Sequence, residues 1–245
     1  MSVWKSIVCL AGSSLMILVS GTVLAQTYGE LDQYMESARE LSVLFRGRQA
    51  EKYEFAYNGN CFWDGPQYRE GDIFYHGKYY RGLEINIDAV QQTPLVRLNS
   101  SSIPIGLSPD DVEYLHIGDR LFENLRLQGH DEAKQGFYEL LVDGGCRLYK
   151  RVDKKLGTSP DNVNGTGIGY TDPYYREKVH TYFEYMPAYF LQRDGGELVG
   201  FRSRGQLLRM LKRKKEIRKH IASRHPDGRV DNETYFVEAI KFVCQ

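Results

Sequence analysis

Cysteine is the residue type in this chain best suited to nucleophilic chemistry, and Cys61 lies in the most distinctive setting. It stands between Asn60 and the aromatic pair Phe62-Trp63, and His180 lies far downstream. A catalytic thiolate needs an imidazole held beside it, which His180 would have to supply. No local signature of a cysteine-protease family accompanies Cys61. The sequence therefore favours a buried or disulfide-linked cysteine flanked by core aromatics.

The remaining chemical motifs are incomplete. The six histidines, at positions 76, 116, 130, 180, 220 and 225, lack the two- to four-residue spacing that places two metal ligands on one face. The glycines from Gly165 to Gly169 resemble a phosphate-binding loop, but they follow a polar stretch rather than a strand and precede no helix. The chain contains no H-E-x-x-H, C-x-x-C or G-x-S-x-G motif. We therefore predict no metal site, no cofactor and no catalytic residue.

The strongest chemical signal is a cluster of cations late in the chain. Residues 202–224 contain ten Lys and Arg side chains and a single acid, Glu216. The preferred interpretation is a solvated helix docked on the rest of the protein. The alternative is a helix that meets anionic lipid headgroups or lipopolysaccharide phosphates, although some cations intrude on its apolar face. The candidate anion-binding residues are Arg209, Lys212, Arg213, Lys215 and Lys219.

The N-terminal residues have the pattern of a secretory leader. Lys5 precedes an apolar stretch at residues 7–19, and Val23-Leu24-Ala25 fits a signal-peptidase site. The stretch is shorter than the roughly 20 apolar residues of a spanning helix, so retention as an uncleaved anchor is the lesser alternative. We therefore predict a signal peptide at residues 1–25, a mature chain at 26–245 and no transmembrane span after cleavage. In that compartment we expect no nucleic-acid partner.

Charge and cysteine content describe the expected mature chain further. Residues 26–200 carry 19 Lys and Arg against 27 Asp and Glu, whereas residues 201–245 carry 12 against 5. The body is thus acidic and the tail basic, and attraction between them favours docking of the tail. Export permits disulfides, but Cys61, Cys146 and Cys244 allow three pairings that the sequence does not distinguish. A bridge from Cys244 to Cys61 or Cys146 would tie down the end of the tail.

The spacing of apolar residues predicts helices at both ends of the chain and strands between them. Residues 29–46 have the three- and four-residue intervals of an amphipathic helix. Glycine-bearing turns at 76–77, 118–119, 143–145 and 194–196 separate short β-type runs and predict antiparallel hairpins. Helical spacing returns over residues 203–224, and a short final helix is predicted at 234–242. The polar residues 157–173 form the longest expected loop.

These elements predict one α+β domain in residues 26–245, with a helix at 29–46, a strand-rich body at 51–201 and a helical tail at 203–245. The expected architecture is an antiparallel β-meander, a curved sheet or half-barrel, packed by the N-terminal helix and two C-terminal helices.

Several stretches of the chain resemble a known group of proteins. They are Gly71–Arg81, Gly136–Leu141, Leu148–Arg151 and Ser203–Leu211, followed by the Lys-rich helix. In these stretches the chain is similar to an uncharacterised family of exported proteins from Bacteroidota. The resemblance implies a location in the periplasm or outer-membrane periphery of a Gram-negative bacterium, and a strand-rich body followed by helices. It implies no activity and no functional residues.

The function we expect from the sequence is non-catalytic binding or scaffolding in the cell envelope, with another envelope protein or an anionic surface as the partner. The first alternative is a peripheral membrane or lipopolysaccharide-phosphate binder that acts through the basic helix 202–224. The second is a hydrolase with its site near the loop 157–173.

Overall fold

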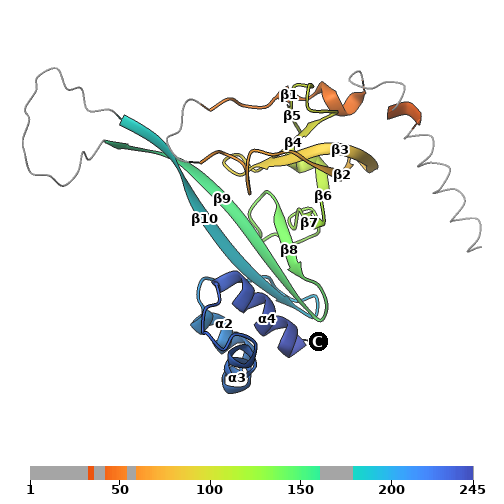
Figure 1. Ribbon diagram of the computed structural model, residues 1–245. Coiled ribbons are helices and arrows are strands. Elements are labelled where there is room, and N and C mark those ends of the chain that lie inside the picture. The colour runs from red at the N-terminus through yellow and green to blue at the C-terminus, as the bar shows by residue number, and fades with distance from the viewer. Residues whose placement is uncertain (1–32, 36–41, 54–58, 161–178, 245) are drawn as a thin grey trace, which may run out of the picture.

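The computed structural model describes residues 33–35, 42–53, 59–160 and 179–244 (Figure 1). The predicted signal peptide and the glycine-rich residues 165–169 lie outside the described residues. Of the predicted helix 29–46, residues 33–35 are helical and Val43–Arg46 forms a 3-10 helix, η2, that buries Leu44 completely. None of the helices in the described ranges is both long and apolar enough to cross a membrane.

Eleven strands in the described residues form one open antiparallel sheet (Figure 1). The predicted antiparallel α+β fold is therefore confirmed. The strands are β1 (Arg48–Gln49), β2 (Arg69–Tyr75), β3 (Lys78–Asp88), β4 (Thr93–Arg97), β5 (Ile105–Gly106), β6 (Val112–Ile117), β7 (Arg120–Glu123), β8 (Tyr138–Val142), β9 (Cys146–Pro160), β10 (Val179–Arg193) and β11 (Val199–Phe201).

The strand order shows two meanders that share β2. The order is β1-β5-β4-β3-β2-β6-β7-β8-β9-β10-β11, so β2 to β5 run outward in one direction and β6 to β11 in the other. The chain returns from β5 through the short 3-10 helix η3 (Pro109–Asp111) to pair β6 with β2. Gly71 is required at this pairing, because a Cβ there would lie 2.1 Å from the carbonyl oxygen of His116.

The predicted hairpins occur at the predicted turns. His76 and Gly77 connect β2 to β3 with φ values of 51° and 71°, which is the left-handed region that tight hairpin turns need. The β9–β10 hairpin is longer than the sequence indicates, because pairing continues out to Pro160 and Val179. Residues 157–160, expected to begin a loop, are therefore strand. Hydrogen bonding to β10 overrides their weak β-propensity.

The C-terminal tail contains three helices rather than the predicted two: α2 (Arg204–Leu211), α3 (Lys214–Arg224) and α4 (Asn232–Cys244). The expected single helix over 203–224 breaks at Lys212, which has a left-handed φ of 59°. At ~100° per residue, one continuous helix would place Ile217 about 180° from Leu208. Breaking the helix lets both side chains reach the same core, where each is buried.

The described residues form three apolar clusters. The first, here called the sheet core, lies on the concave face of the N-terminal strands and includes Trp63, Ile73, Leu115 and Phe122. The second, the helix-covered core, joins Leu148 and Leu191 to Phe236 and the other buried side chains of α2, α3 and α4. The third lies on the opposite face of β8 to β10 and contains Tyr138 and Tyr149. Strand β9 contributes to all three, through Val152, Leu148 and Tyr149 respectively.

Candidate functional site

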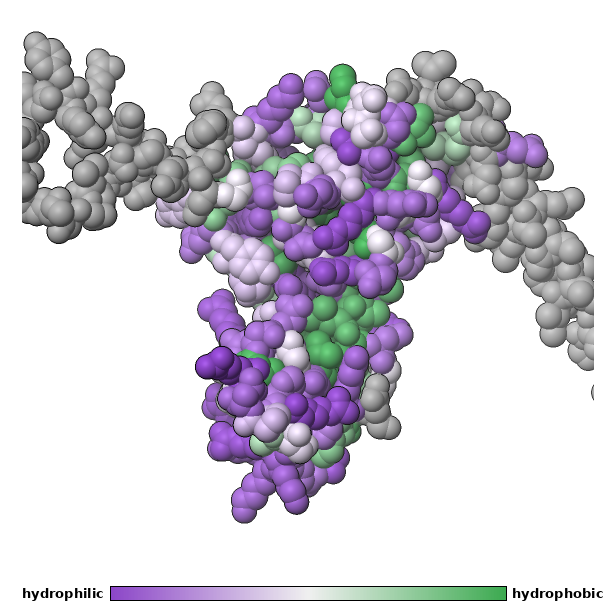
Figure 2. All heavy atoms as spheres, viewed as in Figure 1, coloured by the Kyte–Doolittle hydropathy of each residue, from purple (hydrophilic) through white to green (hydrophobic). Residues whose placement is uncertain are grey.

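The connection between α2 and α3 presents the cations that the sequence singled out. Of the ten Lys and Arg side chains in residues 202–224, all except Arg204 are exposed. We call the set on α2, α3 and their connection the cationic surface. Figure 2 shows hydrophilic side chains over the outside of the helices, with an apolar patch where they approach the sheet. The cationic surface comprises Arg209, Lys212, Arg213, Lys214, Lys215, Arg218, Lys219 and Arg224.

The five candidate anion-binding residues do not share one helix face. Arg209 lies in the last turn of α2, Lys212 is the left-handed residue that ends α2, and Arg213 precedes α3. Arg213 also forms an ion pair with Glu216, so part of its charge is neutralised locally. Lys215 and Lys219 lie one turn apart on α3, on the side away from the buried Ile217 and Ile221. Because the helix breaks at Lys212, the cations are distributed over the connection between α2 and α3 rather than along one helix face.

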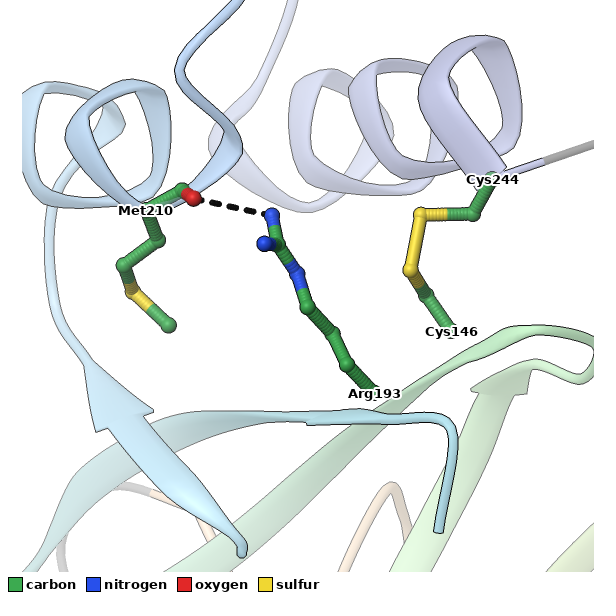
Figure 3. The surroundings of a disulfide bond; sticks show 4 residues. All are labelled: Cys146, Arg193, Met210 and Cys244. Atoms are coloured by element: carbon green, nitrogen blue, oxygen red, sulfur yellow. Dashed lines mark hydrogen bonds between the residues drawn. A yellow bond between two sulfur atoms is a disulfide. The ribbon is translucent and has the colours of Figure 1, made fainter. Parts of the chain in front are cut away.

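Helices α2 and α4 are each fixed to the sheet at one place, and Figure 3 shows both places together. The Arg193 guanidinium, at the end of β10, donates a hydrogen bond of 2.8 Å to the carbonyl oxygen of Met210 in the last turn of α2. A disulfide joins Cys146, the first residue of β9, to Cys244, the last residue of α4, with their Cα atoms 5.6 Å apart. Of the three pairings that the sequence left open, the structure therefore has Cys146 with Cys244.

A cavity of about 410 Å³ lies beneath the cationic surface, between the three C-terminal helices. Its polar wall contains Arg204 from α2 and Arg218 from α3, and its apolar wall contains Leu208, Ile221 and Tyr235. The Arg204 guanidinium lies over the Tyr235 ring, 4.6 Å from the ring centroid, and donates to Asn232 Oδ1 at 2.8 Å. Arg204 is therefore held in place, whereas Arg218 is exposed at the rim.

Cys61 is buried and free, and its surroundings oppose nucleophilic chemistry. Burial, together with the negative charge of Asp88, raises the pKa of the thiol to about 12. At neutral pH the group is thus a thiol rather than the reactive thiolate. Its polar neighbour Lys154 donates to the carbonyl oxygen of Asn60 at 2.9 Å. The side chain of His180, the base that the sequence could have offered, lies outside the described residues.

A polar cavity of about 520 Å³ at the β8–β9 and β10–β11 turns contains His130 and Gln192. Gln192 Nε2 donates both to Gly196 O at 3.1 Å and to His130 Nε2 at 3.2 Å. The proton of the neutral ring therefore lies on Nδ1, which faces Glu132 Oε1 at 3.4 Å. Both ring nitrogens are occupied, and no Ser, Thr or Cys is among the described residues that line this cavity. The arrangement is that of a structural histidine.

An acidic side chain that sequence reasoning missed is buried between the two cores. Glu139 of β8 is 4% exposed; its Oε1 lies 3.4 Å from Arg120 Nη1, and its Oε2 has no hydrogen-bond partner among the described residues. Burial raises the pKa of this carboxyl from 4.5 to about 7, against the opposing effect of Lys150 and Arg120. Lys150, opposite Glu139 in the register, pairs with Glu233 of α4 at 2.6 Å. In the sequence, the indication of this buried acid is a single Glu within an otherwise apolar strand.

The described residues contain no group of three or more His, Cys, Asp or Glu side chains placed to hold a metal ion. The structure thus brings together one set of side chains with a shared chemical character, the cationic surface and the arginine-lined cavity below it. Comparison of the chain with protein-family models, curated proteins and solved structures finds no match.

Proposed function

We propose that this protein is a non-catalytic binding protein of the cell envelope that attaches to anionic surfaces through the cationic surface of α2 and α3. Eight exposed cations stand on two short helices with Glu216 as the one acid among them. That concentration of like charge is the observation on which the proposal rests. An anionic surface, such as lipid headgroups or lipopolysaccharide phosphates, offers ~1 kcal/mol for each cation that approaches it.

The rigid mounting of the helices supports a binding role. A surface of like charges repels itself, and the helices that carry it have only 8 and 11 residues, too short to be stable alone. The Arg193–Met210 hydrogen bond nevertheless fixes α2 to the sheet, and the Cys146–Cys244 bridge fixes α4, with which α2 and α3 share the helix-covered core. The bridge also supports an extracytoplasmic location, because disulfides persist in oxidising compartments.

The states of Cys61 and His130 support the non-catalytic part of the proposal. The pKa of the Cys61 thiol lies far above neutrality, and His130 uses both ring nitrogens in internal contacts. At neutral pH Cys61 is therefore not the thiolate that acts as a nucleophile, and the His130 ring has no free nitrogen to act as a general base.

Cosedimentation with vesicles tests the proposal. At low salt the mature chain is expected to bind vesicles that contain anionic phospholipid, or lipopolysaccharide, and to be released as salt increases. Vesicles of zwitterionic lipid alone should not bind it. Binding that is equal on both vesicle types, or absent from both anionic surfaces, would reject the proposal.

A charge-matched pair of variants makes the test specific to the helices. The first variant replaces the five candidate cations, Arg209, Lys212, Arg213, Lys215 and Lys219, by Gln. The second replaces five exposed cations elsewhere: Arg46, Arg48, Lys78, Arg126 and Lys155. Both variants lose five positive charges, so only a localised binding surface distinguishes them. We expect the first variant to lose most of its vesicle binding and the second to retain most of it.

A further inference from the structure

The cavity beneath the cationic surface has the chemistry of a ligand site rather than a packing defect. Two guanidinium groups, Arg204 and Arg218, line it together with buried apolar side chains. Leu208, Ile221 and Tyr235 are 4%, 5% and 6% exposed and form a firm apolar wall. Its volume of about 410 Å³ is within the usual range of small-molecule sites.

Arg204, Arg218 and Tyr235 all line this cavity, and the Arg204 guanidinium lies 4.6 Å from the centroid of the Tyr235 ring. Burial raises the pKa of the Tyr235 hydroxyl, while the positive charges of Arg204 and Arg218 both oppose that rise. Both guanidinium charges therefore act at the same point of the cavity lining, the Tyr235 hydroxyl. A phosphate or carboxylate at that point would receive charge-assisted hydrogen bonds, which are about twice as strong as neutral ones.

The positive charge at this point is only partly satisfied inside the protein. Arg204 donates to Asn232 Oδ1 and to the carbonyl oxygen of Val230, both of which are neutral groups. No Asp or Glu is among the described residues that line the cavity, and the lining residue His225 is paired with Glu238 at 3.1 Å. Arg218 makes no ion pair with an acid in the described part of the chain. The cavity thus keeps a net positive charge beside an apolar wall.

We propose that this cavity binds the head of an anionic amphiphile, a single phosphate or carboxylate group that carries a hydrocarbon chain. The anionic group contacts Arg218, Arg204 and the Tyr235 hydroxyl, and the first part of the chain lies against Leu208 and Ile221. This inference rests on the proposed function, which it deepens from attachment to a charged surface to recognition of one lipid-like molecule.

Binding of dodecyl phosphate below its micelle concentration, measured by isothermal titration calorimetry, tests the inference. Dodecyl phosphate is expected to bind at one site, and inorganic phosphate and dodecyl maltoside to bind at least tenfold more weakly. Equal affinity for inorganic phosphate would overturn the apolar part of the site, and equal affinity for dodecyl maltoside would overturn the anionic part. No binding of dodecyl phosphate would overturn the site altogether.

A matched pair on α3 separates the cavity from the general charge of the surface. Arg218→Gln and Lys219→Gln each remove one exposed cation from adjacent positions, but only Arg218 lines the cavity. We expect Arg218→Gln to weaken dodecyl phosphate at least about tenfold, since it removes a charged hydrogen bond, and Lys219→Gln to change it less than about twofold. Equal effects of the two variants would overturn the site.

A third variant distinguishes failure of the inference from failure of the proposed function. Ala222→Leu adds side-chain volume to the cavity wall while keeping the charge and the helix propensity of α3. We expect it to abolish dodecyl phosphate binding and to leave vesicle cosedimentation unchanged. Vesicle binding without binding of dodecyl phosphate by the wild type would reject the cavity site alone. Binding of dodecyl phosphate without vesicle binding would reject the surface attachment alone.

Discussion

The sheet core and the helix-covered core are built on the same face of one sheet, but they are closed in different ways. The sheet core consists mainly of strand residues, with contributions from η2 and from loops. In it the Trp63 ring packs edge-on against the Phe122 ring, with their centroids 4.7 Å apart. In the helix-covered core the Phe236 ring packs edge-on against the rings of Tyr189 and Phe201, with ring centroids 4.9 and 5.0 Å apart. However, this core is covered by three separate helices of 8, 11 and 13 residues.

This difference explains why the covalent and polar links between helices and strands lie around the helix-covered core. Neighbouring strands hold one another through ladders of backbone hydrogen bonds, whereas short helices are marginal unless they are anchored. The helix-covered core accordingly has the disulfide, the Arg193–Met210 hydrogen bond and the Lys150–Glu233 ion pair. The helices that cover this core also carry concentrated positive charge, and because like charges repel, these helices depend on such links most. Each prediction below removes or alters one feature that separates or joins the two cores.

The largest expected effect is that of removing the disulfide. The bridge spans 98 residues, and the chain-entropy model assigns about 4.7 kcal/mol to a loop of that size. Replacing both Cys146 and Cys244 by Ala is expected to lower the free energy of unfolding by roughly that amount in urea titrations. Hydrogen exchange should accelerate in α2 to α4 more than in β2 to β6. Uniform acceleration in both regions would show that the two cores are not separately stabilised.

The next effect concerns Glu139, between the two cores. Its pKa is raised to about 7 in the folded protein, so the folded state favours the protonated carboxyl. Stability from this group is fully present below about pH 4.5 and is lost as the pH rises through 7. Glu139→Gln should therefore be more stable than the wild type above pH 7, by up to about 3 kcal/mol, and should differ little at pH 4.

Denaturant titrations at pH 4, 6 and 8 measure this difference. Glu184→Gln is the control, because Glu184 is exposed on β10 and its replacement should leave the pH profile of stability unchanged. A Glu139→Gln variant that is destabilised at pH 8 would show instead that the ionised carboxylate holds Arg120 and Lys150 in place.

The smallest expected effect on stability is that of replacing Lys212, in the connection between α2 and α3. Lys212 has a left-handed φ of 59°, a conformation that costs a residue with a Cβ about 1 kcal/mol. Lys212→Gly is therefore expected to raise the melting temperature slightly, with a gain of roughly 0.5–1 kcal/mol. Lys215→Gly removes the same charge from a helical position and should cost about 1 kcal/mol. Similar shifts for both variants would indicate that α2 and α3 form one continuous helix in solution.

The sequence predicted much of the fold because its strongest signals are local. Glycine at the hairpin turns determines which neighbouring runs pair, and His76-Gly77 illustrates this directly. The return of β6 to β2 could not be predicted, because that pairing depends on the close approach permitted by Gly71, which is not local in sequence. The break at Lys212 was missed because the helical period continues on both sides of it.

The candidate site was predictable only in part. The abundance of cations in residues 202–224 is visible in composition, and nine of the ten are exposed as a solvated segment requires. The cavity was not predictable, because Arg204, Arg218 and Tyr235 come from three helices whose packing angles the sequence does not reveal. The buried Glu139 was equally hidden, since its pKa depends on side chains from β7, β9 and α4.

The placement of the disulfide has a consequence for biogenesis. Under the proposed export, the chain would meet an oxidase with its N-terminal part first, so Cys61 and Cys146 would become available long before Cys244, which follows Cys146 by 98 positions. The wrong pair is thus the first that can form. In the folded protein Cys61 is buried and the pKa of its thiol is about 12, which withdraws that thiol from oxidation and leaves Cys146 for its native partner.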